Sequence, residues 1–209
     1  LELILIRHGE TAWNAEKIFR GRTEIPLDET GKRQAALLAD YLKDEKLEAI
    51  YTSPLERARE TAARIADLQK LEAIPVNNLT DMDYGHWQGK KIIEVEEAYP
   101  ELFNDWMDTP EQIAIPGGES LAQVTGRVVP ILEDLGARHA EGKVAVVTHR
   151  VLVKLIICWL LEVPNNKFWN FQVDTGSQTR FRIQGTRTVL VTANDISCLR
   201  QLKENREDF

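Results

Sequence analysis

The chain has 209 residues, which is long enough to bury the core of a full-sized domain. Hydrophobic residues make up 43% of it and charged residues 28%, and this composition excludes a disordered or fibrous protein. A formal net charge of −7, with no basic stripe, argues against a nucleic-acid partner.

The first predicted element is a buried strand over residues 1–6 that runs directly into Arg7, His8 and Gly9. We expect Gly9 to let the backbone turn sharply there. Open α/β folds hold their ligands at the carboxyl edge of the sheet. Arginine matches the geometry of phosphate, and histidine is a nucleophile or proton carrier near neutral pH. The junction therefore predicts a phosphate site.

A helix over residues 32–43 and a short strand over residues 47–52 are expected next. Ser53 is a good N-cap and Pro54 a good first helical residue, so a helix is predicted from Pro54 to Leu68. Arg57 then lies in its first turn.

A brief strand over residues 73–76 and a loop over residues 79–89 follow. The irregular stretch at about 90–118 is predicted to form two short helices that make a small cap over the site. The next predicted helix, Leu121 to His139, contains Pro130, which we expect to kink or split it.

A third buried strand over residues 143–148 ends in His149 and Arg150, before an apolar helix over residues 151–161. Residues 178–183 and 188–192 alternate like the strands of a hairpin. We expect one domain over residues 1–199 and a charged, solvated tail over residues 200–209.

Three predicted strands thus end in cationic or imidazole side chains. If these strands are parallel and adjacent, Arg7, His8, Arg57 and His149 converge on one pocket. The alternation of strands and helices predicts an α/β fold, a three-layer α/β/α sandwich. Its central sheet is expected to be mostly parallel, with an antiparallel element near the end of the chain.

Four motifs follow one another along the chain. They are Arg7-His8-Gly9-Glu10-Thr11 with Trp13-Asn14, Ser53-Pro54-Leu55-Glu56-Arg57-Ala58, Gly117-Gly118-Glu119-Ser120 and Thr148-His149. Together they resemble the motifs of the histidine phosphatase superfamily, in the branch that holds phosphoglycerate mutases and small bacterial phosphomonoesterases. The sequence is most similar in appearance to bacterial metal-independent phosphoserine phosphatases.

This resemblance implies that His8 attacks phosphorus and becomes a phosphohistidine. Arg7, Arg57 and His149 would surround the phosphoryl oxygens and stabilise their charge, without a metal or other cofactor. The family places a glutamate as general acid where this chain has Asp81, which makes Asp81 the expected acid and base and Asp83 the alternative.

Further contacts with phosphate or with the rest of the substrate are implied, by matched position, for Asn14, Arg20, Gly21 and Tyr84. Arg150 departs from the family, because many relatives carry glycine after the second histidine. Its guanidinium either reaches the substrate or faces solvent.

The expected function is that of a metal-independent phosphatase acting on small phosphomonoesters. Phosphoserine is the first candidate substrate, and phosphoglycerate and α-ribazole phosphate are the next. Two alternatives stay open: a phosphoglycerate mutase, and a non-catalytic phosphate-binding protein whose acid was lost. The expected partner is a small phosphorylated metabolite in the cytoplasm, with no nucleic acid and no membrane. An edge strand or the aromatic segment near Trp169 can also mediate a homodimer.

No catalytic role is predicted for the other two histidines or for the two cysteines. His86 and His139 are expected at the surface, and the four histidines have no metal-ligand spacing. Cys158 and Cys198 are interpreted as buried thiols.

Overall fold

The computed structural model describes residues 1–200 and 202. A six-stranded sheet forms its centre, in the order β3-β2-β4-β1-β5-β6. The strands are β1 (Glu2–Arg7), β2 (Ala49–Thr52), β3 (Ala73–Pro75), β4 (Lys143–Thr148), β5 (Gln178–Gln184) and β6 (Arg187–Asp195). The helices are α1 (Ala12–Ala15), α2 (Glu29–Leu42), α3 (Glu56–Gln69), α4 (Ile92–Ala98), α5 (Pro100–Asp108), α6 (Leu121–Arg138) and α7 (Arg150–Leu160).

The three strands that carry the predicted site are parallel neighbours. In the register of β1 and β4, Arg7 is opposite Thr148, and in that of β2 and β4, Thr52 is opposite Val147. The carboxyl ends of all three strands therefore lie level at one edge of the sheet. β5 pairs antiparallel with β1, and β6 with β5, which confirms the expected antiparallel element.

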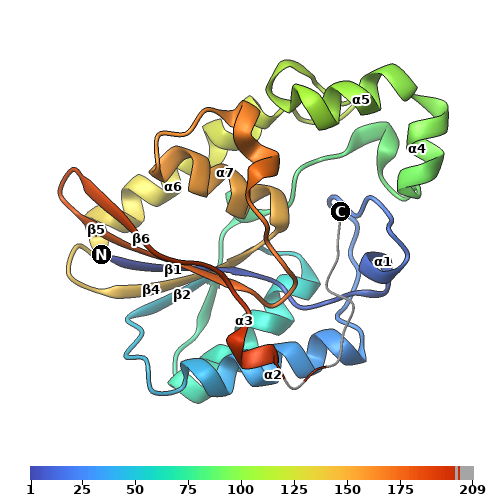
Figure 1. Cartoon of the computed structure of the whole chain (residues 1–209). Helices are drawn as coiled ribbons and strands as arrows, with labels where there is room; N and C mark the ends of the chain where they lie inside the picture. Colours follow the sequence, from blue (N-terminus) through green and yellow to red (C-terminus); the bar gives the residue numbers. More distant parts are fainter. Residues whose placement is uncertain (201, 203–209) are drawn as a thin grey trace.

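Helices cover both faces of the sheet, with α6 and α7 on one side and α2 and α3 on the other (Figure 1). The alternation of β1 explains this arrangement, because successive strand residues point to opposite faces. Leu3 and Leu5 belong to the core under α6 and α7, whereas Ile4 and Ile6 belong to the core over α2 and α3. Burying one such side chain contributes about 1.5–3 kcal/mol to stability. The predicted α/β/α sandwich is confirmed.

The start of α3 differs from the expectation. The N-cap is Leu55 rather than Ser53, and the helix begins at Glu56 rather than Pro54. The Ser53 hydroxyl instead accepts a hydrogen bond from Leu55 N (3.2 Å) and contacts His149 (2.7 Å), so it closes a turn ahead of the helix. Arg57 still lies in the first turn.

Pro130 does not split α6, which continues from Leu121 to Arg138. Pro130 lies on the exposed side of the helix, where water can reach the carbonyl group that lost its hydrogen bond.

Two short helices, α4 and α5, form in the stretch at about 90–118, at the upper right of Figure 1. Trp106 of α5 is 2% exposed and packs edge-on against Tyr84, Trp87 and Trp169. Tyr84, Trp87 and Trp106 are thus core residues, and Trp169 is partly buried against them. The role of this stretch as a cap, and the single domain over residues 1–199, stay predictions.

No helix within the described part of the chain combines the length and the apolar character that crossing a bilayer needs. Most of the predicted tail, residues 201 and 203–209, lies outside the described residues. Cys158 is buried and Cys198 is only partly buried, and within the described part of the chain neither forms a disulfide.

Candidate active site

His8 follows β1 directly and lies at the carboxyl edge of the sheet. Its backbone N donates to Thr148 O (3.0 Å), which ties it to the end of β4. Gly9 serves a different purpose from the sharp turn expected of it, since its backbone does not adopt a positive φ. A Cβ atom there would lie 2.6 Å from Gly31 O, so Gly9 is small to admit the first turn of α2.

The hydrogen bonds of His8 define its tautomer. Its Nδ1 lies 2.7 Å from Gly9 O, and a carbonyl oxygen only accepts, so Nδ1 carries the proton. Its Nε2 accepts a hydrogen bond from Arg57 Nε at 3.3 Å. The Nε2 lone pair therefore points toward the Arg57 side chain and the space that it lines.

Arg57 holds several parts of the site together. Its guanidinium donates to Thr23 O (2.9 Å), to Gly21 O (2.7 Å) and to Asp81 Oδ2 (3.2 Å), in addition to His8. Arg57 and Asp81 form a buried ion pair whose side chains are 0% and 8% exposed. The Arg57 guanidinium therefore lies beside both His8 and the Asp81 carboxylate.

Arg7 is also fully buried, and its Nη1 donates to Val173 O at 2.7 Å. The charges of Arg57, Arg7 and Arg20 act on His8 together. A net negative protein thus has a cationic pocket, as the sequence predicted.

His149 is the N-cap residue of α7 and is fully buried. Its Nε2 lies 2.7 Å from the Ser53 hydroxyl, which already accepts from Leu55 N and has its own proton to donate. This arrangement favours a proton on His149 Nδ1. Among the described residues Nδ1 has no hydrogen-bond partner, and it lies 3.7 Å from Asp81 Oδ2.

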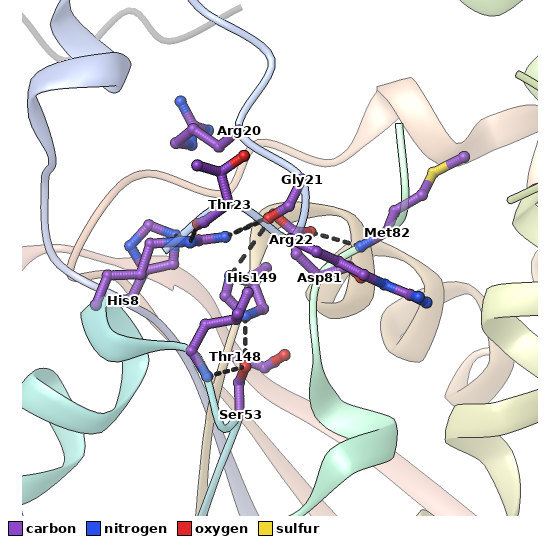
Figure 2. A network of polar contacts seen from close by, with 12 residues as sticks. His8, Arg20, Gly21, Arg22, Thr23, Ser53, Asp81, Met82, Thr148 and His149 are labelled. Atoms are coloured by element: carbon purple, nitrogen blue, oxygen red, sulfur yellow. Dashed lines mark hydrogen bonds and ion pairs between the residues drawn. The ribbon is translucent and has the colours of Figure 1, made fainter. Parts of the chain in front are cut away.

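Asp81 lies close to His149 and contacts Arg57, whereas Asp83 has other partners. One Asp81 oxygen accepts from Met82 N (2.9 Å), and the other lies near both Arg57 and His149. Asp83 Oδ1 accepts from Gly85 N (2.8 Å), and its Oδ2 pairs with Arg22 at 3.6 Å. Figure 2 shows His8, His149, Ser53 and Asp81 within one network of polar contacts. This geometry favours Asp81 over Asp83 as the acid.

Sequence reasoning missed the residues that hold Asp81 in place. Glu119, in the third motif, accepts from Asp83 N (2.9 Å) and pairs with Arg127 (2.9 Å) and Arg22 (3.0 Å). Arg127 Nη2 also donates to Asp81 O at 3.0 Å. The available signal was the glutamate of that motif, which had no role assigned to it.

The predicted substrate contacts fall in different places. Arg20, Tyr84 and Arg150 line one pocket together with Asp81. Gly21, with a φ of +52°, presents its carbonyl oxygen to Arg57, and a Cβ atom there would lie 2.3 Å from the Gln88 side chain.

Asn14 is buried, and its Oδ1 accepts from Thr11 N (3.0 Å) and from the Thr11 hydroxyl (2.9 Å). Its contact with substrate stays a prediction.

The remaining two histidines lie away from this site. His86 is exposed, as expected. His139 is not the simple surface residue that was expected, because its side chain is 11% exposed, with Nδ1 2.7 Å from Glu48 and Nε2 3.0 Å from the Tyr51 hydroxyl. Within the described residues, no three His, Cys, Asp or Glu side chains are grouped to hold a metal ion.

Burial and neighbouring cations control the protonation of His8. Burial first, and then the charges of Arg57 and Arg7, hold the pKa of His8 well below the usual value of 6.5. Because the pKa is lowered, the neutral imidazole predominates at pH 6.5 and persists below it. His149 has its pKa lowered for the same reasons, burial being the largest.

We expect long-range ¹H–¹⁵N NMR of the folded protein to find His8 as the neutral Nδ1–H tautomer at pH 6.5. In the urea-unfolded protein the same side chain should titrate near the ordinary value of about 6.5. A His8 that is half protonated at pH 6.5 in the folded state would contradict the electrostatics described above.

The fold and the site together define an α/β protein with a neutral, oriented and buried imidazole on which the charges of Arg57, Arg7 and Arg20 act. The chain belongs to the histidine phosphatase superfamily, branch 1, whose family model matches residues 3–196.

Three relatives illustrate the similarity. Phosphoserine phosphatase 1 of Hydrogenobacter thermophilus is 40% identical over 198 residues, which is 95% of this chain and 93% of that protein. A metal-independent phosphoserine phosphatase of Arabidopsis thaliana is 37% identical over 158 residues, 74% of this chain and 66% of that one. The solved structure of an Entamoeba histolytica phosphoserine phosphatase mutant in complex with phosphoserine has a TM-score of 0.86 at 28% identity, covering 95% and 98% of the two chains.

Proposed function

We propose that this protein is a metal-independent phosphatase that hydrolyses phosphoserine through a phosphohistidine on His8. One observation carries the proposal: Arg57 Nε donates to the neutral His8 Nε2, and Nη2 of the same guanidinium donates to the Asp81 carboxylate. The named activities of the three relatives support phosphoserine as the substrate.

In the first step, His8 Nε2 attacks phosphorus and the bond from phosphorus to the serine oxygen breaks. Asp81 is a carboxylate in the free enzyme. It takes the proton of the bound phosphate monoester monoanion and gives it to the leaving oxygen, so serine departs neutral at its hydroxyl group. In the second step, Asp81 as carboxylate takes a proton from water while that water attacks the phosphohistidine. Inorganic phosphate leaves with that proton, and neutral His8 and the Asp81 carboxylate are restored.

Fixed hydrogen-bond donors stabilise the charge of the phosphoryl group in both steps. Arg7, Arg57 and the Nδ1–H of His149 surround the phosphoryl oxygens and stabilise the charge that spreads over them in the transition state. They are held by buried contacts, so they need no reorganisation when the charge develops. We infer that these fixed donors replace a metal ion.

We also infer that the enzyme acts in the cytoplasm on a small phosphorylated metabolite. The two cysteines form no disulfide with each other in the described residues, which is consistent with a reducing compartment.

Phosphate release from L-phosphoserine in excess EDTA tests this function. We expect rapid release that added Mg²⁺ does not increase. Release only after metal is added would contradict the proposed chemistry. Isomerisation of phosphoglycerate without free phosphate, dependent on 2,3-bisphosphoglycerate, would show a mutase instead. Binding of phosphate with no turnover of any phosphomonoester would identify a non-catalytic relative.

A further inference from the structure

Arg150 lies at the junction between the phosphoryl site and the pocket beside it. It is the first residue of α7 and follows His149 directly. Asp81 lines the same pocket, along with Lys17, Arg20 and Tyr84. Because Asp81 also contacts Arg57, the part of a substrate that extends away from the leaving oxygen would enter this pocket.

The guanidinium of Arg150 is held in a defined place. The hydroxyl of Tyr84 accepts a hydrogen bond from it, and the Trp169 ring lies 5.8 Å away in a cation–π contact. Trp169 is itself fixed, since its Nε1 donates to Trp106 O at 2.7 Å. Tyr84 is 5% exposed, and burial raises its pKa to about 12, so the hydroxyl stays neutral. Because these contacts already fix the orientation of the Arg150 guanidinium, it loses little conformational entropy when a ligand binds.

The lining of this pocket is mostly cationic. Arg150 lies at the N-terminus of α7, where the helix dipole adds positive potential. Lys17 and Arg20 line the same pocket, and Asp81 is the one carboxylate among its lining residues. An anionic group of a substrate would therefore be attracted to this pocket.

We propose that Arg150 determines specificity by binding the carboxylate of a phosphorylated amino or hydroxy acid while the phosphoryl group lies at His8. This inference rests on the proposed function and adds the chemical class of the alcohol portion. A guanidinium matches a carboxylate with two parallel hydrogen bonds, which an uncharged substituent cannot form. Esters that lack the carboxylate are then poorer substrates.

The test compares two substrates, phosphoserine and phosphoethanolamine, which differ only in the carboxylate. The measured quantity is the ratio of their kcat/KM values. We expect Arg150→Gln to lower the phosphoserine-to-phosphoethanolamine ratio about tenfold or more, because a hydrogen-bonded charge pair is lost for one substrate only. Arg150→Lys, which keeps the charge but not the fork, should fall in between.

Two further variants complete the test. Tyr84→Phe keeps the packed ring and removes the hydroxyl that supports Arg150, so it should lower the ratio in the same direction by a smaller factor. Arg64→Gln, on the exposed side of α3, is the control and should leave the ratio unchanged.

The possible failures are distinguishable. If the unmodified enzyme hydrolyses neither substrate, the proposed function itself is wrong. If it hydrolyses phosphoserine and Arg150→Gln leaves the ratio within twofold of the unmodified value, the carboxylate assignment alone is overturned. A uniform loss on both substrates would likewise contradict it and would indicate a structural role for Arg150.

Discussion

The substitution His8→Ala is expected to lower kcat for phosphoserine by a factor of about 10⁴ or more, since it removes the nucleophile altogether. His8 is 1% exposed at the end of β1, and no other described imidazole has its Nε2 beside Arg57. The measurement is steady-state phosphate release, combined with rapid acid and alkaline quenching to look for phosphate bound to the protein.

A phosphohistidine is stable in alkali and labile in acid, so it should appear in the unmodified enzyme and be absent from His8→Ala. The matched control is His86→Ala, at an exposed histidine outside the site, which should retain full activity. Turnover within tenfold of normal in His8→Ala would refute the proposed mechanism.

The substitution Asp81→Asn is expected to lower kcat for phosphoserine by about 10²–10⁴, because an amide neither donates a proton to the leaving oxygen nor accepts one from water. The loss in the phosphorylation step should be much smaller with p-nitrophenyl phosphate, whose leaving group needs no proton. Single-turnover release of p-nitrophenol measures that step on its own.

Asp83→Asn is the matched control, since Asp83 is bound to Gly85 N and Arg22 instead of facing the site. We expect it to cost less than tenfold. Equal losses in both variants would argue against Asp81 as the acid. Asp81→Glu adds a test of competence: a large gain in activity over the unmodified enzyme would indicate that the aspartate is too short for the proton transfer.

Features that depend on near neighbours in the chain were predictable. The nearly continuous apolar run of β1 predicts a strand with two covered faces. Which helices cover each face became clear only from the folded sheet. The convergence of His8, Arg57 and His149 followed from three strand ends, because the carboxyl ends of adjacent parallel strands share one edge. The hairpin of β5 and β6 likewise followed from its alternation.

Features that depend on distant contacts were not predictable. Ser53 reads as an N-cap in isolation, yet its hydroxyl contacts His149, which is 96 positions away. Gly9 reads as a turn residue, yet its smallness is required by the approach of Gly31. Pro130 is typical of a helix break, yet α6 continues through it, with the proline on the exposed side of the helix.

The order of the motifs along the chain by itself determined the family and the chemical groups of the site. These are the histidine of the first motif, the arginine of the second and the histidine of the last. Only the tertiary structure decided how these groups are arranged. The contact of His8 Nε2 with Arg57, the contact of Arg57 with Asp81 and the support of Arg150 by Tyr84 and Trp169 all depend on side-chain geometry between separate parts of the chain. Hydrogen bonds are directional and short in range, so they form only after packing has brought these elements together.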